Sequence, residues 1–268
     1  MLTLSGSCGP ADRDPHSAPR ADTLGLLVYN IHHGEGMDDV VDLRRVADFI
    51  QALDPDLVAL QEVDSVAQRT GRVDQTAELA RMTGLHGHFG RFMSYQGGAY
   101  GMAVLSRWPV TDVTNWRLTD GEEPRTALGV RVRLPASGEE LLIVGIHFYR
   151  TEAERLAQAS DLEAVLAEEP GPVILAGDFN STPGSAVMER LEEGWRLLDK
   201  GEDRLTFSSF DPVREIDFVL VRPADRFEVL DHRPLHEPVI SDHRPLWTEF
   251  VLRATTAEAP SPPGDGGG

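Results

Sequence analysis

Six apolar segments of this chain carry, at one end, side chains that could bind a metal ion or transfer a proton. They are LLVYN ending at Asn30, LVALQE at Glu62, LLIVGIH at His147, VILAGDFN at Asp178 and Asn180, EIDFVLV containing Asp217, and VISDHRPL containing Asp242 and His243. One Asp or Asn after a strand is usually a turn former, but six such ends favour a shared site. Carboxylate, carboxamide and imidazole groups gathered in this way predict chemistry at a divalent cation.

Local geometry supports a shared pocket. In an extended chain, residues two apart point to the same side, so Asp178 and Asn180 should face one way and Phe179 the other. Asp242 and His243 are neighbours and should point oppositely, so that one binds a metal or braces a partner while the other faces substrate. Carboxylates and carboxamides suit hard divalent cations, above all Mg²⁺.

Composition limits the partners. The 268 residues include 25 Lys and Arg against 44 Asp and Glu, which gives a net charge of −19 and a pI near 4.8. Such a surface repels polyanions, so a small phosphoester substrate is favoured and nucleic acid is disfavoured. Cys8 is the only cysteine, which excludes an intramolecular disulfide and a thiolate metal cluster. Any metal must therefore use oxygen or imidazole ligands.

The two ends of the chain lack a folding pattern. Residues 1–22 and 254–268 are expected to be disordered, and residues 23–253 to form one domain and a monomer. No run of 18 apolar residues predicts a transmembrane segment. The start of the chain lacks the features of a signal peptide, which makes a cytoplasmic location the default expectation. Small residues before Cys8 resemble the end of a lipoprotein signal, so export or lipid anchoring through Cys8 is the alternative.

The segments between the tails alternate between strand and helix patterns. Asp42 should cap a helix that ends at Asp54-Pro55, and a Thr151-x-x-Glu154 capping box should start another. A helix over about 75–82 should close at Gly84, and Thr182-Pro183 should start a helix through Leu191. Strands are expected at 24–29, 57–60, 100–105, 127–134, 140–147, 173–178, 216–221 and 246–252. Several strands follow one another directly, so a mixed α/β fold with antiparallel pairing is predicted.

Six motifs in order carry a family resemblance: YNIHHG, LVALQEVD, GIHFYR, LAGDFNSTP, EIDFVLV and ISDHRPL. From about Leu24 to Phe250 the chain resembles the endonuclease/exonuclease/phosphatase superfamily, the deoxyribonuclease-I-like phosphoesterases. The resemblance implies an α/β (α+β) fold, a four-layer αββα sandwich of two packed mixed β-sheets flanked by helices. It also implies a metal-dependent hydrolase of phosphate esters, with an active site where strand ends of both sheets converge.

The resemblance also implies roles for single residues. Glu62 would be the principal Mg²⁺ ligand, with Asn30 beside it and Asp242 on or near a metal; Mn²⁺ or Ca²⁺ could take the place of Mg²⁺. Asp178 and Asn180 would orient and deprotonate the attacking water. His243, braced by Asp217, would lie against the scissile phosphate, and His147 would contact a nonbridging oxygen. Asp178 and His243 are both candidates for the general base. Asp178 is favoured, because a carboxylate partner stabilises the imidazolium form of His243.

Three further residues could contact the substrate phosphate. His32 stands where related nucleases often have an acidic residue, so it could meet a metal, bind phosphate or only pack in its loop. Arg125 and Arg69 could each present a planar guanidinium to phosphate, or form surface ion pairs instead.

These residues favour a Mg²⁺-dependent phosphoesterase that acts on a small or headgroup-like phosphodiester or phosphomonoester. The first alternative is an endo- or exonuclease with the same chemistry, and the second is a lipid phosphodiesterase of sphingomyelinase type. The lipid enzyme needs an apolar docking surface, and the sequence has no aromatic hairpin insertion to supply one. A non-catalytic binding module has no use for a proton-transfer pair beside a metal site.

Overall fold

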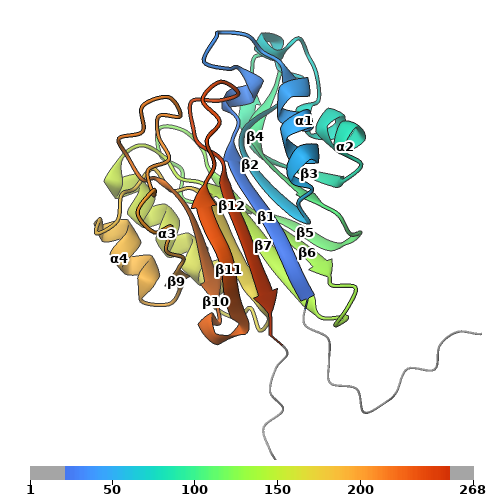
Figure 1. Ribbon diagram of the computed structural model, residues 1–268. Helices are drawn as coiled ribbons and strands as arrows, with labels where there is room; N and C mark the ends of the chain where they lie inside the picture. Colours follow the sequence, from blue (N-terminus) through green and yellow to red (C-terminus); the bar gives the residue numbers. More distant parts are fainter. Residues whose placement is uncertain (1–21, 254–268) are drawn as a thin grey trace, which may run out of the picture.

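Two six-stranded β-sheets pack face to face in this computed structural model, which describes residues 22–253 (Figure 1). The first sheet has the order β11-β12-β1-β2-β4-β3 and contains β1 (Asp22–Asn30), β2 (Leu57–Ser65), β3 (His86–Tyr95), β4 (Gly98–Ser106), β11 (Phe227–Pro234) and β12 (Leu246–Leu252). The second has the order β5-β6-β7-β8-β10-β9 and contains β5 (Val110–Arg117), β6 (Thr126–Arg133), β7 (Glu140–His147), β8 (Val173–Asp178), β9 (Arg196–Leu197) and β10 (Asp217–Arg222). Both sheets are mixed, since β1–β2 and β7–β8 are parallel and the other pairs antiparallel.

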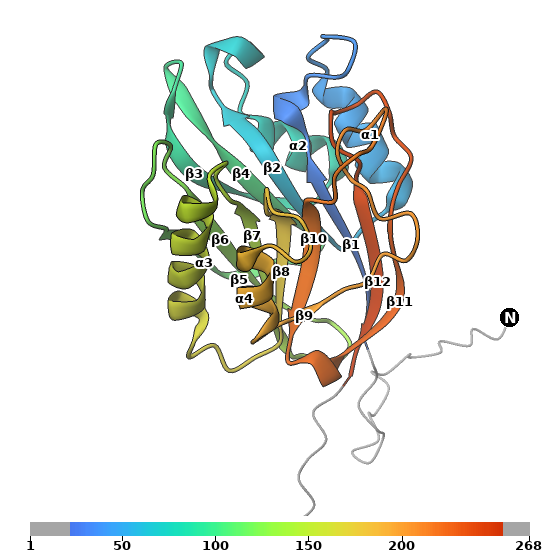
Figure 2. The same ribbon diagram turned by 90° about the vertical axis from the view of Figure 1, so that its left-hand side faces the viewer.

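Helices cover the outer face of each sheet. Helices α1 (Leu43–Leu53) and α2 (Gln75–Thr83) lie on the first sheet, and α3 (Glu152–Leu166) and α4 (Ala186–Glu192) lie on the second (Figures 1 and 2). Three apolar clusters result, one between the sheets and one under each helix pair. Short 3₁₀ turns span His32–Gly34, Gln68–Thr70 and Ala224–Arg226. The predicted four-layer sandwich is confirmed.

Most of the helix signals act as predicted. The Asp42 carboxylate accepts a hydrogen bond from the N–H of Arg44, α2 closes at Gly84, and the Thr151 side chain caps α3. The predicted start of α4 is wrong. Ser185, and not Thr182, accepts the capping hydrogen bond, from the N–H of Met188, and α4 begins three residues later than Pro183.

The predicted tails lie outside the described residues, except that β1 already includes Asp22. Within residues 22–253, none of the helices combines the length and apolar character that crossing a bilayer requires.

Candidate active site

The inward-facing rows of five strands end in polar residues at one end of the sandwich. The apolar members of these rows, all in the cluster between the sheets, are Leu24, Leu26 and Val28 on β1, Leu57 and Ala59 on β2, Leu141 and Ile143 on β7, Ile174 and Ala176 on β8, and Val219 and Val221 on β10. Because side chains alternate along a strand, the same rows end at Asn30, Gln61, His147, Asp178 and Asp217, with Gly145 between Ile143 and His147. All five are at least 95% buried. The polar end of each row therefore forms the floor of one site.

Glu62 reaches the same site through a β-bulge. The register between β2 and β4 shifts between Gln61 and Val63, and Glu62 has φ of 58°. Regular alternation would send Glu62 to the outer face with Val58 and Leu60, whereas the extra residue turns its side chain toward the cavity. There Glu62 Oε1 accepts a hydrogen bond of 3.1 Å from Asn30 Nδ2.

Asp178 is the centre of the polar cluster. Its Oδ1 accepts the N–H of Asn180 at 2.8 Å, and its Oδ2 accepts Asn30 Nδ2 at 3.2 Å. The same Oδ2 lies 3.4 Å from His147 Nε2 and 3.7 Å from His243 Nε2. Burial and the nearby Asp217 charge raise the pKa of Asp178, while His243 opposes the rise. Asp178 is therefore a better proton acceptor than an exposed aspartate.

His243 is held by a buried carboxylate. Its Nδ1 lies 2.9 Å from Asp217 Oδ2, while Nε2 lies 3.4 Å from Asn30 Nδ2. Burial disfavours the charged ring, but the charge and hydrogen bond of Asp217, with Asp178 and Asp242, outweigh burial and raise the pKa of His243 to about 10. His243 is thus an imidazolium at neutral pH, suited to stabilising negative charge.

His147 differs from His243 in its charge. Burial, aided by the charges of Arg125 and His243, holds the pKa of His147 well below its usual value. Its ring is therefore neutral at physiological pH. Two histidines with opposite protonation states face one carboxylate, Asp178, a pattern typical of sites that move protons.

Asn180 shares the pocket with Asp178, but not through the expected extended backbone. It follows β8 in a left-handed conformation with φ of 49°, and its Nδ2 donates to the carbonyl of Phe148 at 2.9 Å. Asp242 lies on the loop before β12, where its backbone carbonyl accepts the N–H of Ser209 at 2.7 Å. Both residues line the cavity.

A cavity of about 610 Å³ opens above this floor. Nine of the residues singled out in the sequence line it: His32, Glu62, Arg69, Arg125, His147, Asp178, Asn180, Asp242 and His243. Asn30 and Asp217 contact this set from below. The structure thus brings all eleven candidates together, while the chemical role assigned to each stays a prediction.

Arg125 and Arg69 both occupy the cavity wall, held by acidic residues. Arg125 is 3% exposed, pairs with Glu123 at 2.9 Å and lies over the Phe92 ring at 4.9 Å. Its Nε has no hydrogen-bond partner among the described residues. Arg69 forms a two-point ion pair with Asp64, at 2.7 and 2.9 Å. Each guanidinium is fixed in place beside the cavity.

The comparisons with known proteins agree with this geometry. The model of the Endonuclease/Exonuclease/phosphatase family matches residues 27–243. The chain belongs to this family. It is 29% identical over 248 residues to the uncharacterized protein YbhP of Escherichia coli K12, covering 85% of this chain and 96% of that protein. Family members are phosphoester hydrolases, and the chain is accordingly an enzyme of this class.

Solved structures show the same fold. A functionally unknown conserved protein from Enterococcus faecalis V583 superposes with a TM-score of 0.73 at 20% identity, over 86% of this chain and all of that one. The mannosyl-6-phosphatase Bt3783 of Bacteroides thetaiotaomicron superposes with a TM-score of 0.68 at 19% identity, over 85% of this chain and all of that one. At these identities the similarity concerns the fold.

The donor set fits the divalent cation that the family implies. Glu62, Asp178, Asp217 and Asp242 crowd four carboxylates at one end of the sandwich, and the pKa of Asp178 is raised mainly by burial and further by the charges of Asp217 and Glu62. A hard cation would relieve the crowding, and Glu62 and Asp242 offer oxygens at the cavity wall. The Asn30 oxygen already accepts the N–H of His32 at 3.1 Å, and its nitrogen faces the carboxylates. The metal-ligand role of Asn30 stays a prediction, and here Asn30 orients Glu62 and Asp178.

Four cavity residues carried no usable sequence signal. Glu123, Arg150, Phe207 and Arg214 line the cavity from loops. The Phe207 ring lies 4.9 Å from the His243 ring and 4.4 Å from the guanidinium of Arg214. Arg150 ends the GIHFYR motif but was given no role there, and the other three belong to no motif and follow no strand end, so only the folded loops place all four at the cavity. His232 also belongs to no motif; it is 7% exposed and contacts Thr248.

Proposed function

We propose that the chain is a Mg²⁺-dependent phosphoesterase that hydrolyses a small or headgroup-like phosphodiester or phosphomonoester. The observation that carries the proposal is the meeting of Asp178, imidazolium His243 and neutral His147 beneath a cavity of about 610 Å³. That volume is typical of small-molecule sites. The net charge of −19 adds weight, since a polyanion would be repelled from most of the surface.

Glu62 and Asp242 would hold the cation, with Asn30 fixing Glu62. The bound ion would neutralise charge on the phosphoryl oxygens. Asp178, held by the N–H of Asn180 and by Asn30, is placed to orient the attacking water and accept its proton. We assign Asn180 to the same water, because its Nδ2 is bound to Phe148 and its oxygen is left to accept.

The two histidines would serve the phosphoryl group. The imidazolium of His243, held by Asp217, supplies positive charge where negative charge develops on the equatorial oxygens. Neutral His147 can donate one hydrogen bond to a nonbridging oxygen. Removing a proton-transfer group of this kind costs about 10²- to 10⁴-fold in rate.

Three arginines in the cavity wall would bind a second anionic group of the substrate. Arg125 and Arg69 are held by Glu123 and Asp64, so they would bind phosphate from fixed positions. Arg214 is stacked on Phe207 and forms no ion pair within residues 22–253. A sugar phosphate, or another small ester with a second charged group, would contact the ion-paired Arg125 and Arg69 and also Arg214. The solved mannosyl-6-phosphatase of the same fold is consistent with this class.

The test is a panel of substrates for the purified full chain with Mg²⁺ or Mn²⁺. Aryl phosphodiesters, aryl monoesters, sugar phosphates, inositol phosphates and cyclic nucleotides are compared with plasmid and single-stranded DNA. We expect hydrolysis of at least one small ester, abolished by EDTA and reduced about 10²- to 10⁴-fold in Asp178→Asn. Cleavage of nucleic acid alone would establish the nuclease alternative, and inactivity toward the whole panel would refute the proposal.

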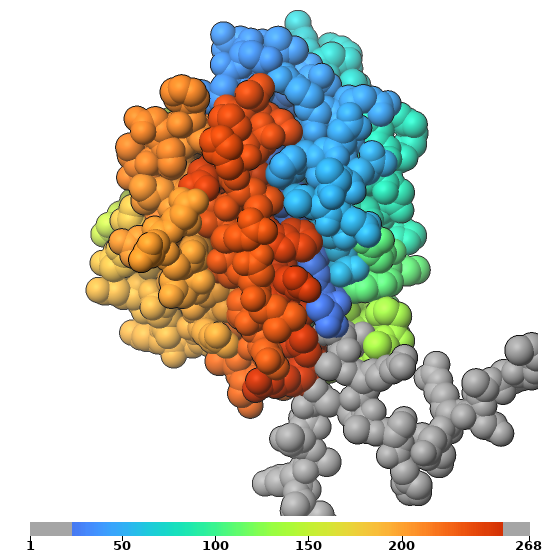
Figure 3. Space-filling model, viewed as in Figure 1, coloured from blue at the N-terminus to red at the C-terminus, as the bar shows by residue number. Residues whose placement is uncertain are grey.

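One surface feature favours a lipid headgroup as a second candidate substrate. Eight of the eleven exposed large apolar side chains in residues 22–253 lie on loops at the cavity end: Met37, Val40, Val41, Val66, Val73, Phe210, Val213 and Val239. Phe210 is 78% exposed and Val213 67%. The loops carrying Met37 and Val239 meet, through a backbone hydrogen bond of 2.8 Å, at the top of the molecule in Figure 3. This apolar rim was not expected from the sequence.

A rim of this kind would suit docking on a lipid surface. The experiment compares hydrolysis of phosphodiester headgroups in zwitterionic vesicles with that of a soluble aryl diester, for the native chain and for Phe210→Asp/Val213→Asp. A lipid enzyme should lose vesicle activity at least about 10-fold more than soluble activity, since docking buries apolar area. Equal loss on both substrates would refute the lipid candidate.

A further inference from the structure

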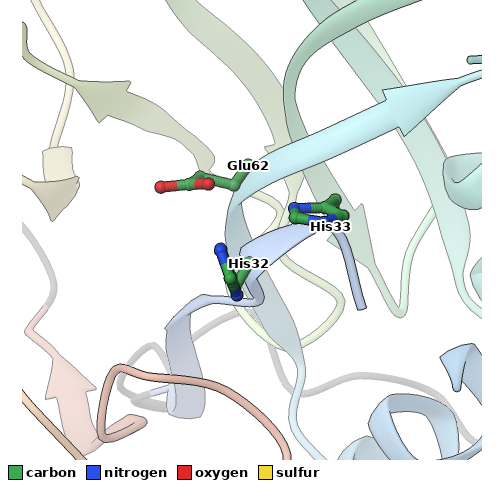
Figure 4. Close-up of side chains that lie close together, drawn as sticks. All are labelled: His32, His33 and Glu62. Carbon is green, nitrogen blue, oxygen red and sulfur yellow. The ribbon is translucent and has the colours of Figure 1, made fainter. Parts of the chain in front are cut away.

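Two histidines that the proposed chemistry leaves unused lie beside Glu62. His32, His33 and Glu62 each place one ligand atom within 4.8 Å of the other two. Figure 4 shows a ring nitrogen of His32 facing Glu62, with His33 at its side, and the two ring centroids are 4.6 Å apart. The first two residues come from the 3₁₀ turn after β1, and Glu62 comes from the bulge of β2.

Glu35 determines which nitrogens of the two rings are free. His32 Nδ1 lies 3.3 Å from the Glu35 backbone carbonyl, and His33 Nε2 lies 2.9 Å from the Glu35 carboxylate. Both oxygens can only accept, so these two nitrogens carry the hydrogens. In the neutral rings, His32 Nε2 and His33 Nδ1 are then lone-pair donors. A histidine whose N–H is bound by a carbonyl or carboxylate is the usual arrangement behind a metal ligand.

The free nitrogen of His33 is an independent sign of a missing ligand. His33 is 6% exposed, and its Nδ1 is buried with no hydrogen-bond partner within residues 22–253. A buried polar atom without a hydrogen-bond partner destabilises the fold. Gln75 Nε2 donates to the His33 carbonyl at 2.7 Å, which fixes the backbone that carries the ring. A bound cation would supply the partner that the ring nitrogen lacks.

The type of ligand predicts the type of cation. Mg²⁺ takes oxygen ligands and rarely imidazole, whereas Zn²⁺, Co²⁺ and related first-row ions bind imidazole readily. Ligands about 2.0–2.2 Å from an ion are at most about 4.4 Å apart, so atoms within 4.8 Å of one another need little movement to bind one ion. Glu62 is half-buried at the cavity wall, where its side chain can make this adjustment.

We infer that His32, His33 and Glu62, braced by Glu35, form a site for an imidazole-binding divalent transition metal. The inference rests on the proposed function only in sharing Glu62 with its cation. It predicts that these three ligands bind Co²⁺ or Zn²⁺ more tightly than Mg²⁺, because two of them are imidazoles.

The test measures metal binding directly, on the full chain freed of metal with EDTA and then dialysed. Co²⁺ is titrated by its visible absorption and by calorimetry, and Mg²⁺ by competition. The variants are His32→Asn, Glu35→Gln and Glu62→Gln, with exposed His86→Ala as the matched control. Asn at position 32 tolerates the left-handed φ of 44°, and circular dichroism verifies folding.

We expect His32→Asn and Glu35→Gln to weaken Co²⁺ binding by about 10- to 100-fold, with His86→Ala unchanged. The Co²⁺ spectrum of the native chain should show nitrogen ligation that His32→Asn removes. Native Co²⁺ affinity in both His32→Asn and Glu62→Gln, or an oxygen-only spectrum, would overturn the inference. If the native chain binds Co²⁺ as expected but hydrolyses nothing in the substrate panel, the inference stands and the proposed function fails.

Discussion

At the scale of single residues, the pair of Asp217 and His243 sets the charge of the site. Asp217 is 2% exposed, and its backbone N–H donates to Thr206 Oγ1 at 3.2 Å, which fixes the carboxylate beside the ring. Burial alone would keep His243 neutral, so its charge depends on Asp217 more than on any other residue. A substitution that keeps the shape of Asp217 but removes its charge therefore tests the function of the charge alone.

Asp217→Asn should lower the pKa of His243, because the charge and hydrogen bond that raise it are lost while burial remains. Less imidazolium at neutral pH should reduce kcat by about 10²- to 10⁴-fold, with a smaller change in KM. The pKa is measured from the ring resonances of His243 by NMR, and the rate on the best substrate of the panel. Exposed Asp225→Asn is the control, and a native rate in Asp217→Asn would contradict the assigned role.

Residue types and order predicted eleven residues that the fold gathers around one cavity, but not how they reach it. Asn30, His147, Asp178 and Asp217 end inward-facing rows, which alternation predicts. Glu62 does not, since only the bulge at φ 58° turns it inward. Loop residues such as Phe207 and Arg214 depend on tertiary contacts that no local pattern encodes.

At the scale of elements, the sequence predicted the inner strands and missed the edges. The four strands not predicted, β3, β5, β9 and β11, are the four edge strands of the two sheets. An edge strand has one hydrogen-bonded neighbour and less burial, so its apolar pattern is weak; β5, for example, is exposed or half-buried along its whole length. Inner strands such as β7 and β8 are buried on both faces and gave continuous apolar runs.

Helix α4 offers a direct test of a corrected helix start. Ser185→Ala should lower the free energy of unfolding by about 1 kcal/mol, because the N–H of Met188 loses its capping partner. Thr182→Ala should change it by less than about 0.5 kcal/mol, since Thr182 is exposed and lies outside the helix. Urea unfolding of both variants measures the difference. Equal losses, or a larger loss for Thr182→Ala, would restore the earlier start.

His232 on edge strand β11 should make stability depend on pH. Its Nδ1 lies 2.8 Å from Thr248 Oγ1 on β12, and burial, aided by the Lys200 charge, lowers the pKa of His232 to about 3. The unfolded chain, with a histidine pKa near 6.5, binds the proton first as pH falls. This contribution to stability is therefore complete above about pH 7 and is lost progressively from there toward pH 3.

Between pH 7.5 and 5.5 the loss from His232 should be about 1.4 kcal/mol. Urea unfolding at the two pH values is compared for the native chain and His232→Gln, and the difference between their pH effects isolates this residue from the other titrating groups. Identical pH effects would show that His232 is protonated in the fold or does not titrate on unfolding.

At the scale of the whole molecule, the acidic balance and the cavity act together. The chain carries 44 acidic against 25 basic residues, and the carboxylates of Glu62, Asp178, Asp217 and Asp242 meet at one end of the sandwich. Like charges so placed destabilise the compact state. Repulsion between these carboxylates therefore destabilises the metal-free fold, and a bound divalent cation would offset this repulsion.

Mg²⁺ or Mn²⁺ should accordingly raise the melting temperature of the whole domain, beyond the effect of KCl at equal ionic strength. At a cation concentration 100 times Kd the gain is about 2.7 kcal/mol, which for a domain of this size is about 5–10 °C. In Glu62→Gln/Asp242→Asn the gain should vanish, and the metal-free domain should melt at a higher temperature than the native one, because two repelling charges are gone. Scanning calorimetry with each salt and after EDTA makes the comparison. Equal melting temperatures in all salts would mean that the carboxylates are not arranged for a cation, whereas a metal-induced rise that survives the double variant would place the cation elsewhere.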